Sequence, residues 1–119
     1  MGDIKIAETE YKFAELIWER EPIGSGELVK LCEKELNWKK STTYTVLRRL
    51  CEKGIFQNQS AQVTSLIKKE EYMALCSEQF VEETFEGSLP MFLAAFMRRK
   101  KLSKKQITEI QQMIDSYEE

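Results

Sequence analysis

The side chains best suited to binding a polyanion gather in one short stretch, residues 38–53, with the sequence WKKSTTYTVLRRLCEK. With about 100° of rotation per residue, a helix over this stretch separates two kinds of side chain. Its inner side holds Thr43, Val46, Leu47, Leu50 and Cys51. Its outer side holds Ser, Thr, Tyr and Arg, although an ordinary solvated face favours better helix formers such as Glu, Lys and Ala. The pattern therefore indicates that the outer side binds a ligand.

The polar groups on this face match those that contact DNA. The two lysines lie at the helix N-terminus, where free backbone N–H groups already favour phosphate. Hydroxyl groups suit base edges or phosphates, and Arg48 suits a guanine or a phosphate equally. We predict base contacts by Ser41, Thr42, Tyr44 and Thr45, phosphate contacts by Lys39, Lys40 and Arg49, and either kind by Arg48. The simpler alternative is that Ser41 and Thr42 only cap the helix and that both arginines are merely solvated.

Composition argues against catalysis and metal chemistry. The 119-residue chain contains no histidine, the most common general base and metal ligand, and its five glycines form no phosphate-binding loop. The cysteines Cys32, Cys51 and Cys76 are far apart and include no CxxC pair, so we expect reduced thiols on helix faces. We predict that the protein is not an enzyme and needs no metal or cofactor.

The net charge of −2 is unevenly distributed. Residues 1–36 carry five Lys or Arg against nine Asp or Glu, a balance of −4. Residues 37–68 carry six Lys or Arg against the single Glu52, a balance of +5. Because a phosphate backbone senses charge within about one Debye length, this local excess favours DNA in spite of the acidic total.

Size and hydropathy bound the remaining possibilities. With 42% hydrophobic residues, the chain can form one domain or two very small ones. No apolar run approaches the length of a membrane span, and the N-terminal residues MGDIKIAETE lack the regions of a signal peptide. We expect a cytoplasmic protein without membrane insertion.

The order of predicted elements in the first half defines a fold. Helices are predicted at 7–20, 26–36 and 40–53, with a short extended piece at Ile23 between Pro22 and Gly24. Two strands at 55–59 and 62–66 flank the tight turn Ser60-Ala61. Helix, turn, helix and hairpin is the order of a winged helix-turn-helix module. The hairpin contains no Lys or Arg, so we expect it to add little DNA affinity. A hairpin that only covers the core is at least as well supported as one that contacts DNA.

The second half is predicted to be wholly helical. A helix from Lys69 towards Glu86 ends at Gly87-Ser88, and Ser103 with Gln106 forms a capping box for the last helix. Its apolar stripes are too extensive to be buried within one small chain, which favours a symmetric dimer. The predicted fold is mainly α, with a winged-helix domain at 1–68 and a helical dimerisation domain at 69–119. The predicted dimer interface is Leu89, Phe92, Leu93, Phe96, Met97, Ile107, Ile110, Met113, Ile114 and Tyr117.

Three motifs resemble those of the penicillinase and methicillin-resistance repressors (the BlaI/MecI/CopY type). They are LIW at Leu16, Ile17 and Trp18; the set Trp38, Thr42, Thr45, Val46, Arg49 and Leu50; and KLS at Lys101, Leu102 and Ser103. The resemblance covers nearly the whole chain. It implies a dimeric repressor with an N-terminal winged helix, DNA contacts around Lys40, Ser41, Thr42, Tyr44 and Thr45, and Arg49 near phosphate.

The resemblance also implies a route of regulation. In the family, a membrane sensor-protease system leads to cleavage of an Asn-Phe bond in the penultimate helix, and the corresponding pair here is Ala95-Phe96, without the asparagine. The copper-responsive branch has a C-terminal cysteine cluster, whereas this chain has no cysteine after Cys76. We predict a homodimeric repressor that binds an inverted-repeat operator through the helix Lys40 to Lys53 in the major groove. The alternatives are a winged-helix protein-interaction module and a small-ligand-sensing regulator.

Overall fold

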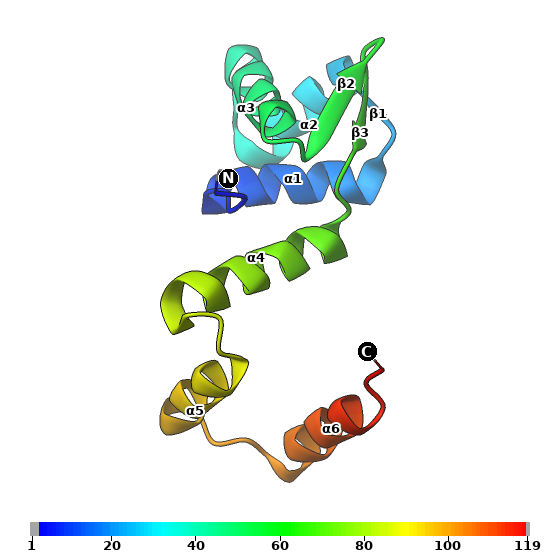
Figure 1. Cartoon of the computed structure of the whole chain (residues 1–119). Coiled ribbons are helices and arrows are strands. Elements are labelled where there is room, and N and C mark those ends of the chain that lie inside the picture. Colours follow the sequence, from blue (N-terminus) through cyan, green and yellow to red (C-terminus); the bar gives the residue numbers. More distant parts are fainter. Residues whose placement is uncertain (1–2, 119) are drawn as a thin grey trace. The chain divides into compact units, whose positions relative to one another are not determined.

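The computed structural model describes residues 3–118, which form six helices and a three-stranded sheet (Figure 1). The elements are α1 (Glu8–Arg20), β1 (Ile23–Gly24), α2 (Ser25–Leu36), α3 (Lys40–Glu52), β2 (Phe56–Gln59), β3 (Gln62–Ser65), α4 (Lys69–Phe85), α5 (Leu89–Arg99) and α6 (Lys104–Asp115). Every helix and strand predicted from the sequence is present, with its ends within about two residues of the predicted ones. The chain divides into two compact units, unit 1 up to Ser77 and unit 2 from Glu78.

The ends of the helices in unit 1 follow local sequence signals. Glu8 and Glu10 lie in the first turn of α1, where they complement the helix dipole. Helix α2 ends at Asn37, which adopts the left-handed conformation with φ 57°. Gly54 follows α3 with φ 80°, as the sequence predicts for a glycine cap. These caps keep the three helices short enough to pack around one core.

The core of unit 1 is sealed from solvent. Helices α2 and α3 lie against α1, and the sheet stands beside them (Figure 1). The largest fully buried side chains come from all of these elements: Phe13, Phe56, Ile17, Leu28, Leu50, Ile55 and Val63. Burying such side chains contributes about 1.5–3 kcal/mol each. Unit 1 therefore provides a rigid support for its surface residues.

The sheet is antiparallel, in the order β1-β3-β2. Ile23 pairs with Val63 at one edge of β3, and Asn58 pairs with Val63 at the other. The hairpin turns at Ser60 and Ala61, which both have positive φ, 53° and 61°. Two such residues in succession are typical of a type I′ turn, whose twist matches that of the strands. The tight turn predicted at Ser60-Ala61 is thus confirmed, and the hairpin forms the wing.

The first turns of α4 belong to unit 1. Tyr72 is buried, and its hydroxyl accepts a hydrogen bond of 3.0 Å from the backbone N–H of Ile6. The indole N–H of Trp18 donates to the carbonyl of Ile67 at 3.0 Å. These contacts explain why the division into compact units falls after Ser77, inside α4. The boundary predicted after residue 68, as a limit of independent folding, stays a prediction.

The carboxylate of Glu21 joins the end of α1 to the last residue of β3 and to the segment that follows it. It accepts hydrogen bonds from the backbone N–H of Ser65 at 2.8 Å and from the Ser65 hydroxyl at 2.7 and 2.8 Å. Lys68 Nζ donates to it at 3.2 Å. Burial raises the pKa of Glu21, but the hydrogen bonds from Ser65 and Lys68 together lower it by more. The net result is a pKa below the usual value.

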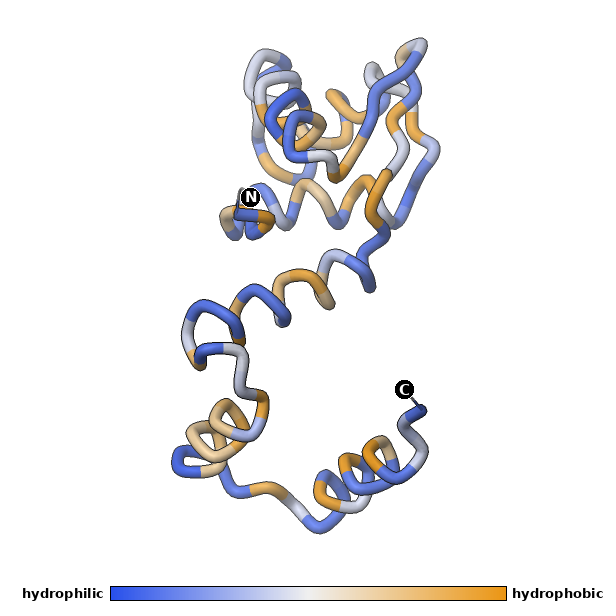
Figure 2. The backbone as a smooth tube through the Cα atoms, in the orientation of Figure 1, coloured by the Kyte–Doolittle hydropathy of each residue, from blue (hydrophilic) through white to orange (hydrophobic). Residues whose placement is uncertain are grey.

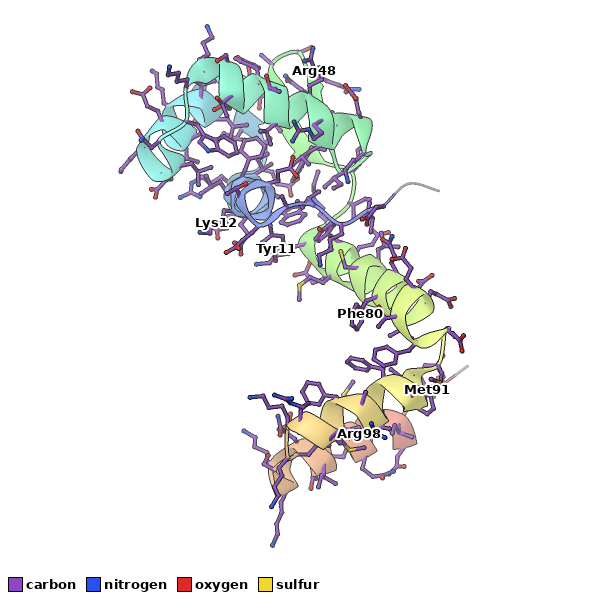
Figure 3. All side chains as sticks on the ribbon, turned by 90° about the vertical axis from the view of Figure 1, so that its left-hand side faces the viewer. Tyr11, Lys12, Arg48, Phe80, Met91 and Arg98 are labelled. Carbon is purple, nitrogen blue, oxygen red and sulfur yellow. The ribbon has the colours of Figure 1, made fainter. Side chains whose placement is uncertain are left out.

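Unit 2 contains the end of α4 together with α5 and α6. Ser88 caps α5 by accepting from the N–H of Met91 at 3.2 Å, and Ser103 with Gln106 forms the predicted capping box of α6. Edge-to-face ring contacts join Phe80, Phe85 and Phe92, with Phe80 on the side of α4 that faces α5 (Figure 3). None of the described residues 78–118 is buried. Unit 2 therefore lacks a sealed core of its own.

Candidate nucleic-acid interface

The N-terminus of α3 is arranged to receive an anion. Its first residues, Lys40, Ser41 and Thr42, are all exposed, and its first turn contains no acidic residue. The N-cap residue is Lys39, whose side chain makes no capping hydrogen bond. The first N–H groups of a helix have no intrahelical partner and carry a partial positive charge. The alternative that Ser41 and Thr42 serve as N-caps therefore does not describe this helix, since both lie inside it.

The two sides of α3 are divided as the helical periodicity predicts. Thr43, Val46, Leu47 and Leu50 are buried, and Cys51 is half-buried. All the residues predicted to contact DNA are exposed: Lys39, Lys40, Ser41, Thr42, Tyr44, Thr45, Arg48 and Arg49. Arg48 lies on the side of α3 away from α1 (Figure 3). The structure thus brings the predicted site together on one face of one rigid helix.

The side chain of Tyr44 is held by a hydrogen bond within unit 1. Its hydroxyl lies 3.3 Å from the hydroxyl oxygen of Ser25, the first residue of α2, and donates to it. Ser25 is itself buried, and its backbone N–H donates to the carbonyl of Ala61 in the wing turn at 2.8 Å. Ser25 therefore connects the exposed face of α3 to the start of α2 and to the tip of the wing.

A groove of about 540 Å³ separates α3 from β2. Its lining includes Thr45 and Arg48 from the helix and Asn58 from the wing. The Thr45 hydroxyl donates to the Ser41 carbonyl at 2.8 Å, so its remaining acceptor capacity and its methyl group are what it can offer a ligand. Among the described residues, Arg48 has no ion pair. Asn58 was named in the sequence only as one of several neutral wing residues, and its position opposite Arg48 could not be foreseen.

Arg49 differs from Arg48 because it is engaged within the fold. Its guanidinium donates to the Glu10 carboxylate at 2.6 Å, and Glu10 also accepts from the backbone N–H of Ala7 at 3.0 Å. Burial raises the pKa of Glu10, but the N–H of Ala7 and the guanidinium of Arg49 together lower it by more. The net result is a pKa below the usual value. Arg49 therefore fixes α3 to α1, and only its exposed edge is open to a phosphate.

Lys53, at the end of α3, is also used internally. Its ammonium donates to the backbone carbonyls of Asp3 and Lys5 at 2.9 and 3.1 Å. The positive charge available to a ligand is therefore concentrated at Lys39, Lys40 and Arg48. Sequence reasoning missed the supporting roles of Glu10 and Ser25, and the acidic first turn of α1 was the only local signal for either.

The cysteines do not contribute to this face as a metal site. All three are free thiols, Cys32 buried and the other two half-buried. Burial raises the pKa of Cys32, while the neighbouring Thr43 hydroxyl lowers it slightly. Within residues 3–118, no group of His, Cys, Asp and Glu side chains is placed to hold a metal ion. Over the same residues, no helix is long and apolar enough to cross a membrane.

The residues predicted to form a dimer interface lie in α5, in α6 and just after α6. Phe92, Leu93 and Ile110 are half-buried, and the others are exposed. The pair Ala95-Phe96 lies inside α5, with Ala95 half-buried and Phe96 44% exposed. This pair stays a candidate cleavage position, as the family resemblance implies.

The fold and this face together define a mainly helical protein of the winged helix-turn-helix class, with an exposed cationic face on α3. Comparison with known families makes the assignment specific. The family model described as penicillinase repressor matches residues 6–116, and the chain belongs to that family of DNA-binding transcriptional repressors. The resemblance inferred from the sequence motifs is thus confirmed, and the family description is that of a regulator rather than an enzyme.

Individual relatives are similar over most of their length. The penicillinase repressor of Bacillus licheniformis is 25% identical over 117 residues, which cover 95% of this chain and 91% of the relative. That of Staphylococcus aureus is 20% identical over 116 residues, covering 94% and 92%. The solution structure of the monomeric form of Bacillus licheniformis BlaI in complex with the blaP half-operator has a TM-score of 0.50 and 27% identity, and the match covers 60% of this chain and 94% of that chain.

Proposed function

We propose that the protein is a homodimeric repressor that binds an inverted-repeat operator, with α3 in the major groove. In this arrangement Lys39 and Lys40 bind phosphate at the start of α3, and the hydroxyl side chains face the base edges. Arg48 faces a base or a phosphate across the groove from Asn58. The site of action is the cytoplasm, where the operator is accessible.

The observation that carries this proposal is the start of α3. A helix that begins with two exposed lysines, has no side-chain cap and then presents exposed hydroxyls is suited to an anionic partner. The buried side of the same helix holds it in place, so the exposed groups are preorganised. Binding of a half-operator by the relative from Bacillus licheniformis supports the same role for this face.

Dimerisation follows from the small charge of a single recognition face. With Arg49 and Lys53 engaged internally and no Lys or Arg in the wing, one copy has few cations for phosphate. A second copy makes the second half-site contact effectively intramolecular, which can raise affinity by about 10²–10⁴. Two helices in a symmetric dimer then fit half-sites one or two DNA turns apart.

A gel shift with the DNA upstream of the protein's own gene, across a salt series, tests DNA binding. We expect specific binding whose affinity falls steeply with salt, because each phosphate contact releases counterions. Failure to bind any nearby promoter specifically, with a salt slope near zero, would contradict the proposal. A monomer in light scattering at micromolar concentration would contradict the dimer.

Arg48→Glu is the sharpest variant for this test, because Arg49 also stabilises the fold through Glu10. We expect Arg48→Glu to weaken operator binding by about 10- to 100-fold, since a dimer carries two copies of the change. Arg20→Glu at the exposed end of α1 is the matched control, with the same change of charge away from α3. An unchanged operator affinity in Arg48→Glu would favour a protein-interaction module instead.

A further inference from the structure

Helix α6 presents an apolar stripe that is largely exposed to solvent. Ile107, Ile110 and Ile114 follow one another at helical spacing, and Tyr117 lies just beyond the end of the helix. Ile114 is 60% exposed and Tyr117 is 74% exposed. Hydrophobic and hydrophilic residues alternate along this helix (Figure 2). Such a stripe is typical of a surface that another chain covers.

The charges along α6 run opposite to the helix dipole. Lys104 and Lys105 occupy the first turn, which contains no acidic residue. Asp115 ends the helix, Glu118 follows it, and the last turn contains no basic residue. Acidic side chains are normally favoured at the start of a helix and basic ones at its end. The reversed order is therefore a local cost that an oppositely charged partner at each end would offset.

The positive end of α6 adjoins a hydrophobic groove. Residues 98–105 include six Lys or Arg and no acidic residue. Within unit 2, a groove of about 410 Å³ is lined by the apolar side chains of Met97, Leu102 and Ile107 and by the two lysines Lys100 and Lys101. This combination suits an aromatic side chain that is followed by carboxylates.

The same chain carries such a segment at the other end of α6. Tyr117 is followed by Glu118, and Asp115 lies one turn before it. Resting on the proposed homodimer, we propose that the α6 helices of two copies pair antiparallel about a two-fold axis near Ile110 and Gln111. Each copy then inserts the Tyr117 side chain into the groove of the other, with Asp115 and Glu118 beside the lysines.

The spacing along α6 fits this arrangement. With the axis between residues 110 and 111, Ile107 lies opposite the partner's Ile114, and Lys104 lies opposite the partner's Tyr117. In a two-fold interface each contact occurs twice, so both ends of both helices are matched. The helix is about 18 Å long, at 1.5 Å per residue, so the apolar stripe is covered over its whole length. A parallel pairing would instead place lysines against lysines.

Mixing the protein with a charge-swapped chain tests the orientation. The swapped chain carries Lys100→Glu, Lys101→Glu, Lys104→Glu, Lys105→Glu, Asp115→Lys and Glu118→Lys, so that every charge at the proposed contact is reversed. The changes within α6 agree with the helix dipole and should preserve the helix. Each chain alone is expected to form homodimers. After subunit exchange, native mass spectrometry of differently tagged chains is expected to show heterodimer about fivefold or more below the statistical share of about one half. At about 1 M salt the heterodimer should recover, because ionic contacts are screened.

The other outcomes overturn the inference in distinct ways. An excess of heterodimer indicates parallel pairing, and a statistical mixture at low salt indicates no contact between the charged ends. Failure of the swapped chain to form homodimers, while the unmodified chain does, indicates that the lysines meet other acidic groups, such as Glu82 and Glu83 of α4. If the unmodified chain is itself a monomer, the proposed homodimer falls as well.

A second variant tests the groove separately from the charges. Tyr117→Ala should raise the dimer dissociation constant about tenfold or more in analytical ultracentrifugation, because Tyr117 would fill a pocket in the partner. Met73→Ala is a matched control, an exposed apolar side chain in unit 1. Equal dissociation constants for these two variants would overturn the insertion of Tyr117.

Discussion

Unit 1 and unit 2 bury their apolar side chains to very different extents. In unit 1 the side chains of Phe13, Phe56 and Ile17 are completely shielded from solvent. In unit 2 the aromatic and aliphatic stripes of α5 and α6 remain at the surface, with Met113 70% exposed. A buried side chain stabilises the fold within one chain, whereas an exposed stripe stabilises it only when another surface covers it. The difference indicates that unit 1 carries its own stability, whereas the stripes of unit 2 contribute little stability within one chain.

This division has a functional consequence for the recognition helix. The face of α3 is fixed by contacts inside unit 1, through Glu10 and Ser25. Its shape therefore does not require a second copy, and the proposed dimer acts on affinity by placing two such faces on one DNA. Under the proposed function, separating the two copies through unit 2 would lower operator affinity while α3 itself stays folded.

The largest expected effect breaks unit 1 alone. Phe56→Ala removes a fully buried ring and should lower the free energy of unfolding by about 3–5 kcal/mol. Both tryptophans, Trp18 and Trp38, lie in unit 1, so tryptophan fluorescence in urea reports on that unit. Phe96→Ala in unit 2 is the counterpart and should leave this transition unchanged in a monomeric sample. A comparable loss in both variants would show that the two units unfold as one.

The second effect concerns the joint between α1 and the segment before α4. Glu21→Ala should lower the free energy of unfolding at pH 7 by about 1–3 kcal/mol, because the N–H of Ser65 loses its acceptor. The folded-state pKa of Glu21 lies below its unfolded value near 4.5, so its stabilisation is complete above that value and is lost as the pH falls through the folded pKa.

Urea titrations at several pH values measure this contribution. The stability of the unmodified protein should decline with acid below about pH 4.5, and Glu21→Ala should decline less. Some decline should remain, because the pKa of Glu10 is lowered as well. Glu19→Ala, an exposed neighbour on α1, is the control and should change stability by less than about 0.5 kcal/mol. Equal acid sensitivity in both variants would contradict the role of Glu21.

Sequence periodicity predicted which face of each helix is buried, but not which side chains meet across the fold. The inner side of α3 was predicted because Thr43, Val46, Leu47 and Leu50 recur at helical spacing. The pairing of Arg49 with Glu10 spans 39 residues, and that of Tyr44 with Ser25 spans 19. Helical spacing shows which side chains share a face of a helix, but not which other element that face contacts. Contacts of this kind are therefore visible only in the folded chain.

Helix α4 shows the same limit in another form. Its sequence gives one stripe that includes Tyr72, Cys76 and Phe80, which predicts a single helix face in the second domain. In the structure Tyr72 packs in unit 1, and Phe80 joins the aromatic rings of unit 2. The stripe is continuous because the start of the helix packs on the core of unit 1 and its end contacts the aromatic rings of unit 2. Periodicity identifies a buried face but not the core into which it is buried.

The smallest effect sharpens the account of the wing, where Ala61 adopts φ 61° without being glycine. The left-handed conformation costs a residue with a Cβ atom roughly 1 kcal/mol, and glycine avoids the cost. Ala61→Gly should therefore raise the free energy of unfolding of unit 1 by about 0.5–1 kcal/mol in urea.

Gly54→Ala is the reverse substitution, because Gly54 has φ 80° and open space around its missing Cβ. This variant should lower the free energy of unfolding by a similar amount. If Ala61→Gly stabilises unit 1 without changing operator affinity, the wing turn serves only the fold. A change in operator affinity would instead mean that Ser25, which donates to the Ala61 carbonyl, transmits the conformation of the wing to Tyr44.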